Sequence, residues 1–309
     1  MFIEDNNKIL KKCLKCDKKK VLSNKDCKIC PATKILNNLK ILTPDETLNE
    51  IIYNNKSLAR YGDVEFELIF GINKEGFQNS NKNISEKLRE VLCNNEKNLL
   101  IGIPNGFNEN YRNLYVEKSK RFWEKWTNKN KYKLVNLIDL NKTYRSTDIS
   151  RFYSKYKDRS HIGEYVKKLK MVWDNKDIVM IEGEKTRLGL GNDLFSNAKS
   201  IQRILCPNSN AFDLYDKIYN EAIKIDKEKL IILALGPTAT ILAYDLNKLG
   251  YQVIDVGHVD IEYEWYLRKA EYKMKIENKH IYEIKNGTII DDDVHDENYN
   301  KQIIIKILN

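Results

Sequence analysis

Two carboxylates separated by one residue, Asp63 and Glu65, follow a short apolar run in the stretch RYGDVE. A D-x-E pair of this kind can bind a hard divalent cation while the oxygens of a diphosphate complete its coordination. Arg60 can meet a phosphate, and Gly62 lets the backbone approach a ligand closely. From the spacing alone, an aspartate that caps a helix among solvated neighbours is the simpler interpretation.

A second polar stretch, IEGEKTRLGLGNDLF at residues 181–195, also follows a strand-like run. It has neither the G-x-G-x-x-G pattern of a dinucleotide fold nor the Gly-Lys-Ser/Thr ending of a P-loop. A loop relaxed by Gly191, with Arg187, Asn192 and Asp193 beside it, can grip the ribose and phosphates of a nucleotide. An ordinary connection between a strand and a helix is an equal interpretation.

The third stretch, ALGPTATILAYDL, reads as a strand followed by a helix start. Gly236 follows the apolar run, Pro237 suits the first helical position, and Thr238 lies in the first turn. The free N–H groups of a helix N-terminus bind anions readily. The same residues also make a well-built helix start that needs no ligand.

The fourth stretch, DVGHVDIEYEWYL, carries ionisable residues at every second position: His258, Asp260, Glu262 and Glu264. They share one face if the segment is extended. If a helix begins near Asp260 instead, Glu264 stays on the same face and Glu262 turns away. Either arrangement gathers more ionisable groups beyond a strand end than a solvated surface requires, which predicts an acid/base or metal site.

The elements that must position these residues are strand-like runs alternating with amphipathic helical patterns. Strands are predicted at SLARYG, NLLIGIP, YKLVNLI, DIVMIEG, IQRILCP, LIILALG and YQVIDVG, with helical patterns between several of them. Such alternation predicts βαβ units, and therefore an α/β fold whose mostly parallel sheet is covered by helices on both faces. Ligands of such sheets bind beyond the carboxyl ends of the strands, where the four stretches fall.

Four cysteines near the beginning of the chain form two C-x2-C pairs separated by ten residues: Cys13, Cys16, Cys27 and Cys30. Two such pairs can close a tetrahedron of thiolates around a zinc ion, and a four-thiolate site is structural because it leaves no open coordination position. Disulfides and unliganded thiols are the alternatives. The absence of a secretion signal counts against disulfides.

The basic charge of the chain is concentrated in the same segment. Residues 1–40 hold eleven lysines and four acidic residues, a net charge of +7, which leaves +2 of the chain's +9 for residues 41–309. A nearly neutral body argues against nucleic-acid binding across a broad surface. No apolar stretch approaches the roughly 18 to 20 residues that span a bilayer, and we expect a cytoplasmic protein. The expected organisation is a basic four-cysteine segment, 1–40, and one domain, 41–309.

Together, the four stretches and ENYNKQII near the end of the chain resemble the bacterial glycosyltransferases of the GT-D fold, a family formerly catalogued as a domain of unknown function. The matching stretches run in the family's order over roughly residues 43–309, and the long second one makes chance similarity improbable. The resemblance implies a Rossmann-like fold and transfer of a sugar, often glucose, from a UDP-sugar to a growing glycan of a surface polysaccharide or glycoprotein. The cysteine-bearing segment lies outside it.

The resemblance also implies roles for single residues. The family's metal-linked D-x-E motif falls on Asp63 and Glu65, with Mn²⁺ (or Mg²⁺) as the ion. The sequence has Val64 where the family pattern has glycine, but the D-x-E spacing is kept. Residues expected to contact the nucleotide sugar are Arg60, Gly62, Arg187, Gly191, Asn192, Asp193, Gly236, Pro237, Thr238 and His258. If the reaction inverts the anomeric centre, a carboxylate of Asp260, Glu262 or Glu264 deprotonates the acceptor hydroxyl, and Glu262 is the first choice.

Two other functions compete with this interpretation. A sugar-nucleotide hydrolase needs the same grip on metal and phosphate, and only transfer to an acceptor separates the two classes. A zinc-knuckle nucleic-acid-binding protein accounts for the lysines of residues 1–40 but leaves the acidic cluster near Asp260 unexplained. For the transferase, the expected partners are a UDP-sugar, a glycan or glycoprotein acceptor, and partner glycosyltransferases or an anionic membrane surface at the basic segment.

Overall fold

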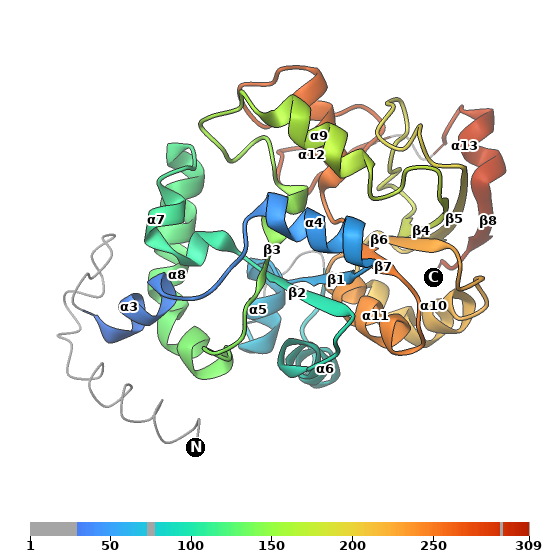
Figure 1. The fold of residues 1–309 in the computed structure, drawn as a ribbon. Helices are drawn as coiled ribbons and strands as arrows, with labels where there is room; N and C mark the ends of the chain where they lie inside the picture. The colour runs from blue at the N-terminus through green and yellow to red at the C-terminus, as the bar shows by residue number, and fades with distance from the viewer. Residues whose placement is uncertain (1–29, 73–77, 291–292, 309) are drawn as a thin grey trace.

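The computed structural model describes residues 30–72, 78–290 and 293–308. Within them, eight strands form one sheet in the order β3-β2-β1-β7-β6-β4-β5-β8, and all neighbouring strands are parallel (Figure 1). The strands are β1 Ser57–Arg60, β2 Leu99–Ile103, β3 Arg145–Ser146, β4 Asp177–Gly183, β5 Ser200–Cys206, β6 Leu230–Ala234, β7 Val253–Asp255 and β8 Ile303–Lys306. The predicted parallel α/β fold is confirmed.

Helices cover both faces of the sheet (Figure 1). Those of the described residues are α3 Pro31–Asn37, α4 Pro44–Asn54, α5 Asp63–Ile69, α6 Lys82–Cys93, α7 Glu109–Arg112, α8 Glu117–Leu137, α9 Ile162–Lys170, α10 Tyr215–Ala222, α11 Pro237–Lys248, α12 Val259–Leu267 and α13 Glu297–Gln302, with 3₁₀ turns η1 Asn105–Phe107, η2 Thr147–Ser150 and η3 Ala211–Leu214. Because strand side chains alternate, each face builds its own core. Ala59 of β1 packs with α5, α6, α8 and α11, whereas Leu58 packs with α4, α9 and α12.

One predicted strand is wrong. The stretch YKLVNLI, residues 132–138, forms the last turns of the long helix α8 and its C-cap. Leu134, Val135 and Ile138 are buried there, a spacing that also fits one face of a helix. A short apolar run cannot be assigned by periodicity alone, and here the helix that precedes it simply continues.

Helix α3 lies ahead of the expected domain boundary at residue 41, yet it packs against α8. Ala32 and Leu36 of α3 are buried in the same core as the α5 face of the sheet. Cys30 precedes the helix and is buried, with its Sγ 3.6 Å from the hydroxyl of Tyr132. The structure therefore places residues 30–40 with the α/β body, whereas Cys13, Cys16 and Cys27 lie outside the described residues.

No helix in the described segments combines the length and the apolar character that crossing a bilayer requires.

Candidate active site

Two neighbouring strands send their chains to opposite faces of the sheet, and in open α/β folds the ligand crevice forms at such a point. β1 and β7 are paired, but β1 leads into α5 on one face while β7 leads into α12 on the other. Figure 1 shows the two helices on opposite sides of the sheet. This arrangement is the topological switch point of an open α/β sheet, the place where such folds bind ligands. The two strand ends bring in RYGDVE and DVGHVD.

The D-x-E pair lies in the first turn of α5. Asp63 is half-buried, whereas Glu65 is buried and accepts a hydrogen bond from the N–H of Gly62, 2.6 Å away. A Cβ at residue 62 would lie 3.1 Å from Glu65 Oε2, so glycine keeps this cap unobstructed. Burial raises the pKa of Glu65 to about 7, and the negative charges of Asp255 and Asp63 add to the rise. Three carboxylates thus repel one another at this corner of the crevice.

Arg60 supplies the nearest positive charge. Its Nε lies 3.4 Å from Asp255 Oδ1, and its Nη1 donates to the carbonyl of Thr147 and to the hydroxyl of Ser150. A Cβ at Gly257, whose φ is +46°, would clash with the guanidinium. The glycine of DVGHVD is therefore what makes room for the arginine of RYGDVE.

Arg151 and Glu283 belong to the same cluster and were missed in the sequence. Arg151 pairs with Glu283, and its Nη1 lies 3.9 Å from Glu262 Oε1. The negative charge of Asp63 also contributes to keeping the pKa of Arg151 high against the effect of burial. Glu283 Oε1 lies 3.9 Å from His258 Nδ1. No local motif marks either residue, because Arg151 follows the short 3₁₀ turn η2 and Glu283 lies in an irregular segment.

Several polar atoms of the crevice are buried and have no hydrogen-bond partner among the described residues. They are Arg60 Nε, Arg151 Nη1, His258 Nδ1 and Thr238 Oγ1. Thr238 comes from the first turn of α11, which packs against β1 and whose Thr240 hydroxyl donates to the Arg60 carbonyl at 2.8 Å. Buried polar groups are normally satisfied, so such a group of atoms from four elements indicates a binding site for a polar, anionic ligand.

The alternating acids of DVGHVDIEYEW lie on a helix, the second of the two arrangements considered from the sequence. Asp260 and Glu264 share a face, and both accept from Lys279 Nζ, at 2.6 and 3.0 Å. Glu262 turns away and accepts from the N–H groups of Tyr153 and Ser154 at 2.9 and 2.6 Å. All three carboxylates are at most 2% exposed.

A family model described as "Glycosyltransferase GT-D fold" matches residues 58–284. This chain belongs to that family. It is similar to Glycosyltransferase GlyD of Streptococcus pneumoniae serotype 4, with 36% identity over 266 residues, 86% of this chain and 32% of the relative. It is also similar to the probable glycosyl transferase Gly of Streptococcus gordonii, with 34% identity over 276 residues, 87% of this chain and 39% of the relative. The chain thus spans about a third of the length of these curated relatives.

Solved structures agree with the family. One, described as the domain of unknown function 1792 with a distinct glycosyltransferase fold, has a TM-score of 0.84 at 37% identity and covers 90% of this chain and 99% of its own. A second, described as a new glycosyltransferase from Streptococcus sanguinis, has a TM-score of 0.80 at 32% identity, covering 87% and 99%. The resemblance inferred from the motifs is confirmed, as is the enzyme class to which the family belongs.

The side chains of the second motif of this GT-D chain contact α12 and the segment that follows it. Arg187 is buried and donates to the carbonyl of Asn278 at 3.0 Å. Asn192 donates to Asp260 and Glu264, and Asp193 accepts from the hydroxyl of Tyr263 at 2.6 Å. These contacts tie the loop to α12 and to the segment after it. Gly191, with a φ of +76°, lines a separate pocket.

Three of the residues predicted to contact the nucleotide sugar lie at the N-terminus of α11. Gly236 is the N-cap with a φ of +53°, Pro237 is the first helical residue, and Thr238 is buried behind them. Because this helix packs against β1 and β7, its N-terminus lies at the same edge of the sheet as Arg60. The structure thus brings together Arg60, Gly62, Asp63, Glu65, Gly236, Pro237, Thr238 and His258.

A pH dependence of stability follows from His258. Burial, and then the charge of Arg151, lower the pKa of this histidine to about 3, whereas the unfolded chain binds the proton near pH 6.5. The stabilisation is therefore present above the unfolded value and is lost as the pH falls. Between about pH 7 and about pH 5, we expect the free energy of unfolding to fall by about 1–2 kcal/mol more in the wild type than in His258→Gln. Urea denaturation at both pH values measures this difference, and equal losses would contradict it.

Proposed function

We propose that the protein transfers a sugar from a UDP-sugar to a glycan acceptor, with a divalent cation at the Asp63–Glu65 pair. The observation that carries the proposal is the set of buried, unpartnered polar atoms beside that pair in the crevice. A diphosphate needs hydrogen-bond donors and positive charge on one side and a cation on the other. The crevice offers both kinds of group from neighbouring elements.

The residues fit a cation that is shared with its substrate. Among the described residues, no three His, Cys, Asp or Glu side chains form a ready-made metal cage. Mn²⁺ or Mg²⁺ of this kind is commonly held by one or two carboxylates together with substrate phosphates. The raised pKa of Glu65 beside Asp63 and Asp255 reflects excess negative charge that a cation would neutralise. When bound, the cation would stabilise the charge that develops on the departing diphosphate.

The side chains of the crevice would then bind and orient the donor. Arg60 Nε and Arg151 Nη1 lie near carboxylates but have no hydrogen-bond partner among the described residues, and they would hold the phosphates. Thr238 would add its hydroxyl at the α11 N-terminus. His258 stays neutral at physiological pH, so it can accept or donate a hydrogen bond without adding charge. Glu283 would keep Arg151 oriented toward the phosphates.

The three carboxylates of α12 that could act as the acceptor base are all engaged by hydrogen bonds within the protein. Glu262 accepts two backbone N–H groups and the hydroxyl of Ser154, which occupies lone pairs that a base would need. Asp260 and Glu264 are engaged by Lys279. We propose that these three carboxylates hold the walls of the crevice, and that their role as a base is the weaker alternative.

The proposal is tested by thermal stabilisation with nucleotides and nucleotide sugars, with and without Mn²⁺. We expect UDP or one UDP-sugar, with UDP-glucose as the first candidate, to raise the Tm by about 5 °C at a saturating concentration when the metal is present. Asp63→Asn should lose the metal-dependent part of the shift. Absence of a shift with every nucleotide would contradict the donor site.

A sugar-nucleotide hydrolase would give the same shifts, and the products separate the two functions. The transferase is expected to extend an acceptor glycan of a surface polysaccharide or glycoprotein, whereas a hydrolase releases free sugar from the same donor. The names of the two curated relatives favour transfer. Salt-sensitive retardation of RNA or DNA in a gel would instead favour the nucleic-acid alternative.

The basic segment, residues 1–40, carries two further proposals: a structural zinc site and docking onto a partner enzyme or an anionic membrane. Both depend mainly on residues outside the described part of the chain. Metal analysis of the purified protein should find one zinc ion that Cys13→Ser removes. Deletion of residues 1–29 should abolish sedimentation with anionic vesicles while leaving α3 in place.

A further inference from the structure

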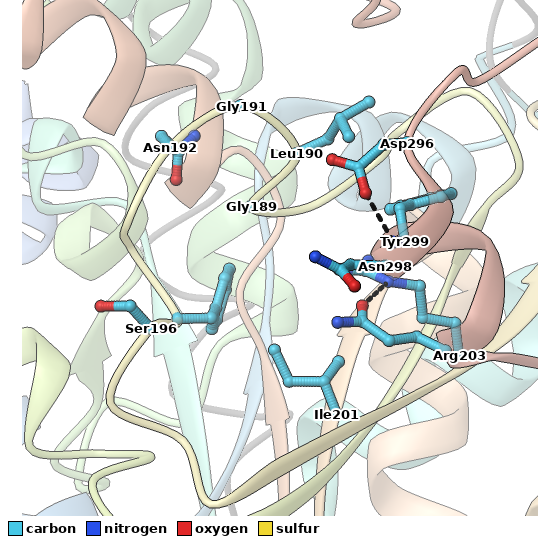
Figure 2. A pocket seen from close by; sticks show the side chains of 12 residues that line it. Gly189, Leu190, Gly191, Asn192, Ser196, Ile201, Arg203, Asp296, Asn298 and Tyr299 are labelled. Atoms are coloured by element: carbon cyan, nitrogen blue, oxygen red, sulfur yellow. Dashed lines mark hydrogen bonds between the residues drawn. The ribbon is translucent and has the colours of Figure 1, made fainter.

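A second candidate site lies between the loop 189–196, β5 and α13 (Figure 2). It is a pocket of about 450 Å³, within the size range of sites for small organic ligands. Three strands, β7, β6 and β4, separate β5 from β1 in the sheet. At about 4.8 Å per strand, β5 lies roughly 19 Å from β1 across the sheet.

The charges of this pocket are already balanced. Arg203, which is 3% exposed, pairs with Glu182 and donates to the carbonyl of Leu188 and to Gln302 Oε1, both at 2.8 Å. Asp296 accepts from the backbone N–H of Tyr299 at 2.9 Å, as the dashed line in Figure 2 marks. Because each guanidinium nitrogen already donates a hydrogen bond and Glu182 pairs the charge, Arg203 offers the pocket little positive charge with which to attract a phosphate.

Its remaining polar groups suit a neutral ligand that forms hydrogen bonds. Tyr299 is 3% exposed, its ring stacks on the Arg203 guanidinium at 4.3 Å, and its hydroxyl has no hydrogen-bond partner among the described residues. A buried hydroxyl without a hydrogen-bond partner is unusual, and it favours a ligand that forms a hydrogen bond with it. Asn298 and Ser196 add an amide and a hydroxyl to the lining.

Apolar side chains complete the surface. Phe195, Ile201 and Leu190 line the same pocket, so polar groups alternate with surfaces that can contact C–H groups. A sugar ring presents hydroxyls at its edge and C–H groups on its faces, and it carries no charge. We propose that this pocket binds a neutral sugar unit of the acceptor, remote from the hydroxyl that reacts. The inference rests on the proposed transfer to a glycan.

The loop of the pocket is tied to the helix that lines the crevice. The N–H of Gly189 donates to Asp260 at 3.0 Å, and Asn192 donates to Glu264 at 2.6 Å. Helix α12 therefore supports both sites. The base of a nucleotide is the competing occupant, but Arg60, whose Nε has no hydrogen-bond partner among the described residues and would hold the phosphates, lies on β1, which three strands separate from β5.

The test measures binding of the fluorescently labelled full chain to an array of neutral glycans. Asn298→Trp fills the pocket from an exposed position of α13, and Asn300→Trp is the matched control on the same helix, outside the lining. We expect at least one glycan to bind the wild type and the control with similar affinity. The affinity of Asn298→Trp for the same glycan should be more than about tenfold lower. Tyr299→Phe keeps the ring and should weaken binding by roughly five- to tenfold without lowering the Tm.

Three results would overturn the proposal: no glycan binds the wild type, Asn298→Trp binds as the wild type does, or UDP alone displaces the glycan. Stabilisation by UDP and Mn²⁺ is measured on the same samples. It should be equal in the wild type, Asn298→Trp and Asn300→Trp, so a failure of the donor site shows separately from a failure of the pocket.

Discussion

Replacing Asp63 with asparagine is expected to lower sugar transfer by about 10³-fold while leaving the chain folded. Asp63 is half-buried at the first position of α5, where its charge interacts with the helix dipole, worth about 0.5 kcal/mol, and with Arg151. The loss of activity would come from the cation and from the charge on the departing diphosphate. Transfer from a radiolabelled UDP-sugar, measured at saturating Mn²⁺, gives the comparison.

A matched control separates helix effects from the metal. Glu117 is the first residue of α8, its side chain is exposed, and it belongs to none of the segments that form the crevice. Glu117→Gln removes a carboxylate from an equivalent helix position and should leave transfer unchanged. Full activity of Asp63→Asn, or an equal loss in the control, would refute the role of Asp63 as a metal ligand.

Glu65→Gln should affect stability in the opposite direction from activity. A glutamine Oε1 can still accept from the N–H of Gly62, so the cap of α5 is kept. Because burial, with help from Asp255 and Asp63, raises the pKa of Glu65, removing its charge should stabilise the metal-free protein. Loss of Mn²⁺-dependent UDP binding together with a higher Tm without metal is the expected pair of results.

The sequence predicted the parts of this fold that depend on local pattern. Strands with continuous apolar character, such as Leu230–Ala234, were found because both of their faces are buried. The strand β3 was missed because two residues are too few to show a hydrophobic pattern. The edge strand β8 was missed because its side chains are only partly buried or exposed, so its sequence does not show the alternation of a half-buried strand. Tertiary pairing defines them.

The site shows the same division. RYGDVE and DVGHVD could be placed beyond strand ends, and the sheet brings them together because β1 and β7 are neighbours. The partners of the motifs could not be predicted, since Arg151 and Glu283 reach the crevice through segments without regular pattern. The motif around Arg187 was expected at the nucleotide, and its contacts to Asn278 and α12 depend on a chain crossing that no spacing reveals.

The largest stability effect is expected at Lys279. This lysine is 1% exposed and bridges Asp260 and Glu264. Burial acts to raise the pKa of Glu264, yet Lys279, Asn192 and Arg268 hold it below its usual value. Lys279→Met would leave the buried Asp260 without its cation and Glu264 with Arg268 as its cation, so the free energy of unfolding should fall by about 3–5 kcal/mol. Chemical denaturation measures the change, and Lys248→Met, at an exposed site of α11, should cause little.

Removing a carboxylate together with the lysine tests why the acids of α12 are there. In Asp260→Asn/Lys279→Met, the asparagine can still accept from the N–H of Gly189, and Glu264 keeps Arg268 and Asn192. We therefore expect the double variant to recover at least about half of the stability lost by Lys279→Met, because a broken buried pair costs more than an absent one. If the carboxylates of α12 only stabilise the walls of the crevice, transfer activity should recover together with the free energy of unfolding. Recovery of stability without activity would instead assign Asp260 a part in the chemistry.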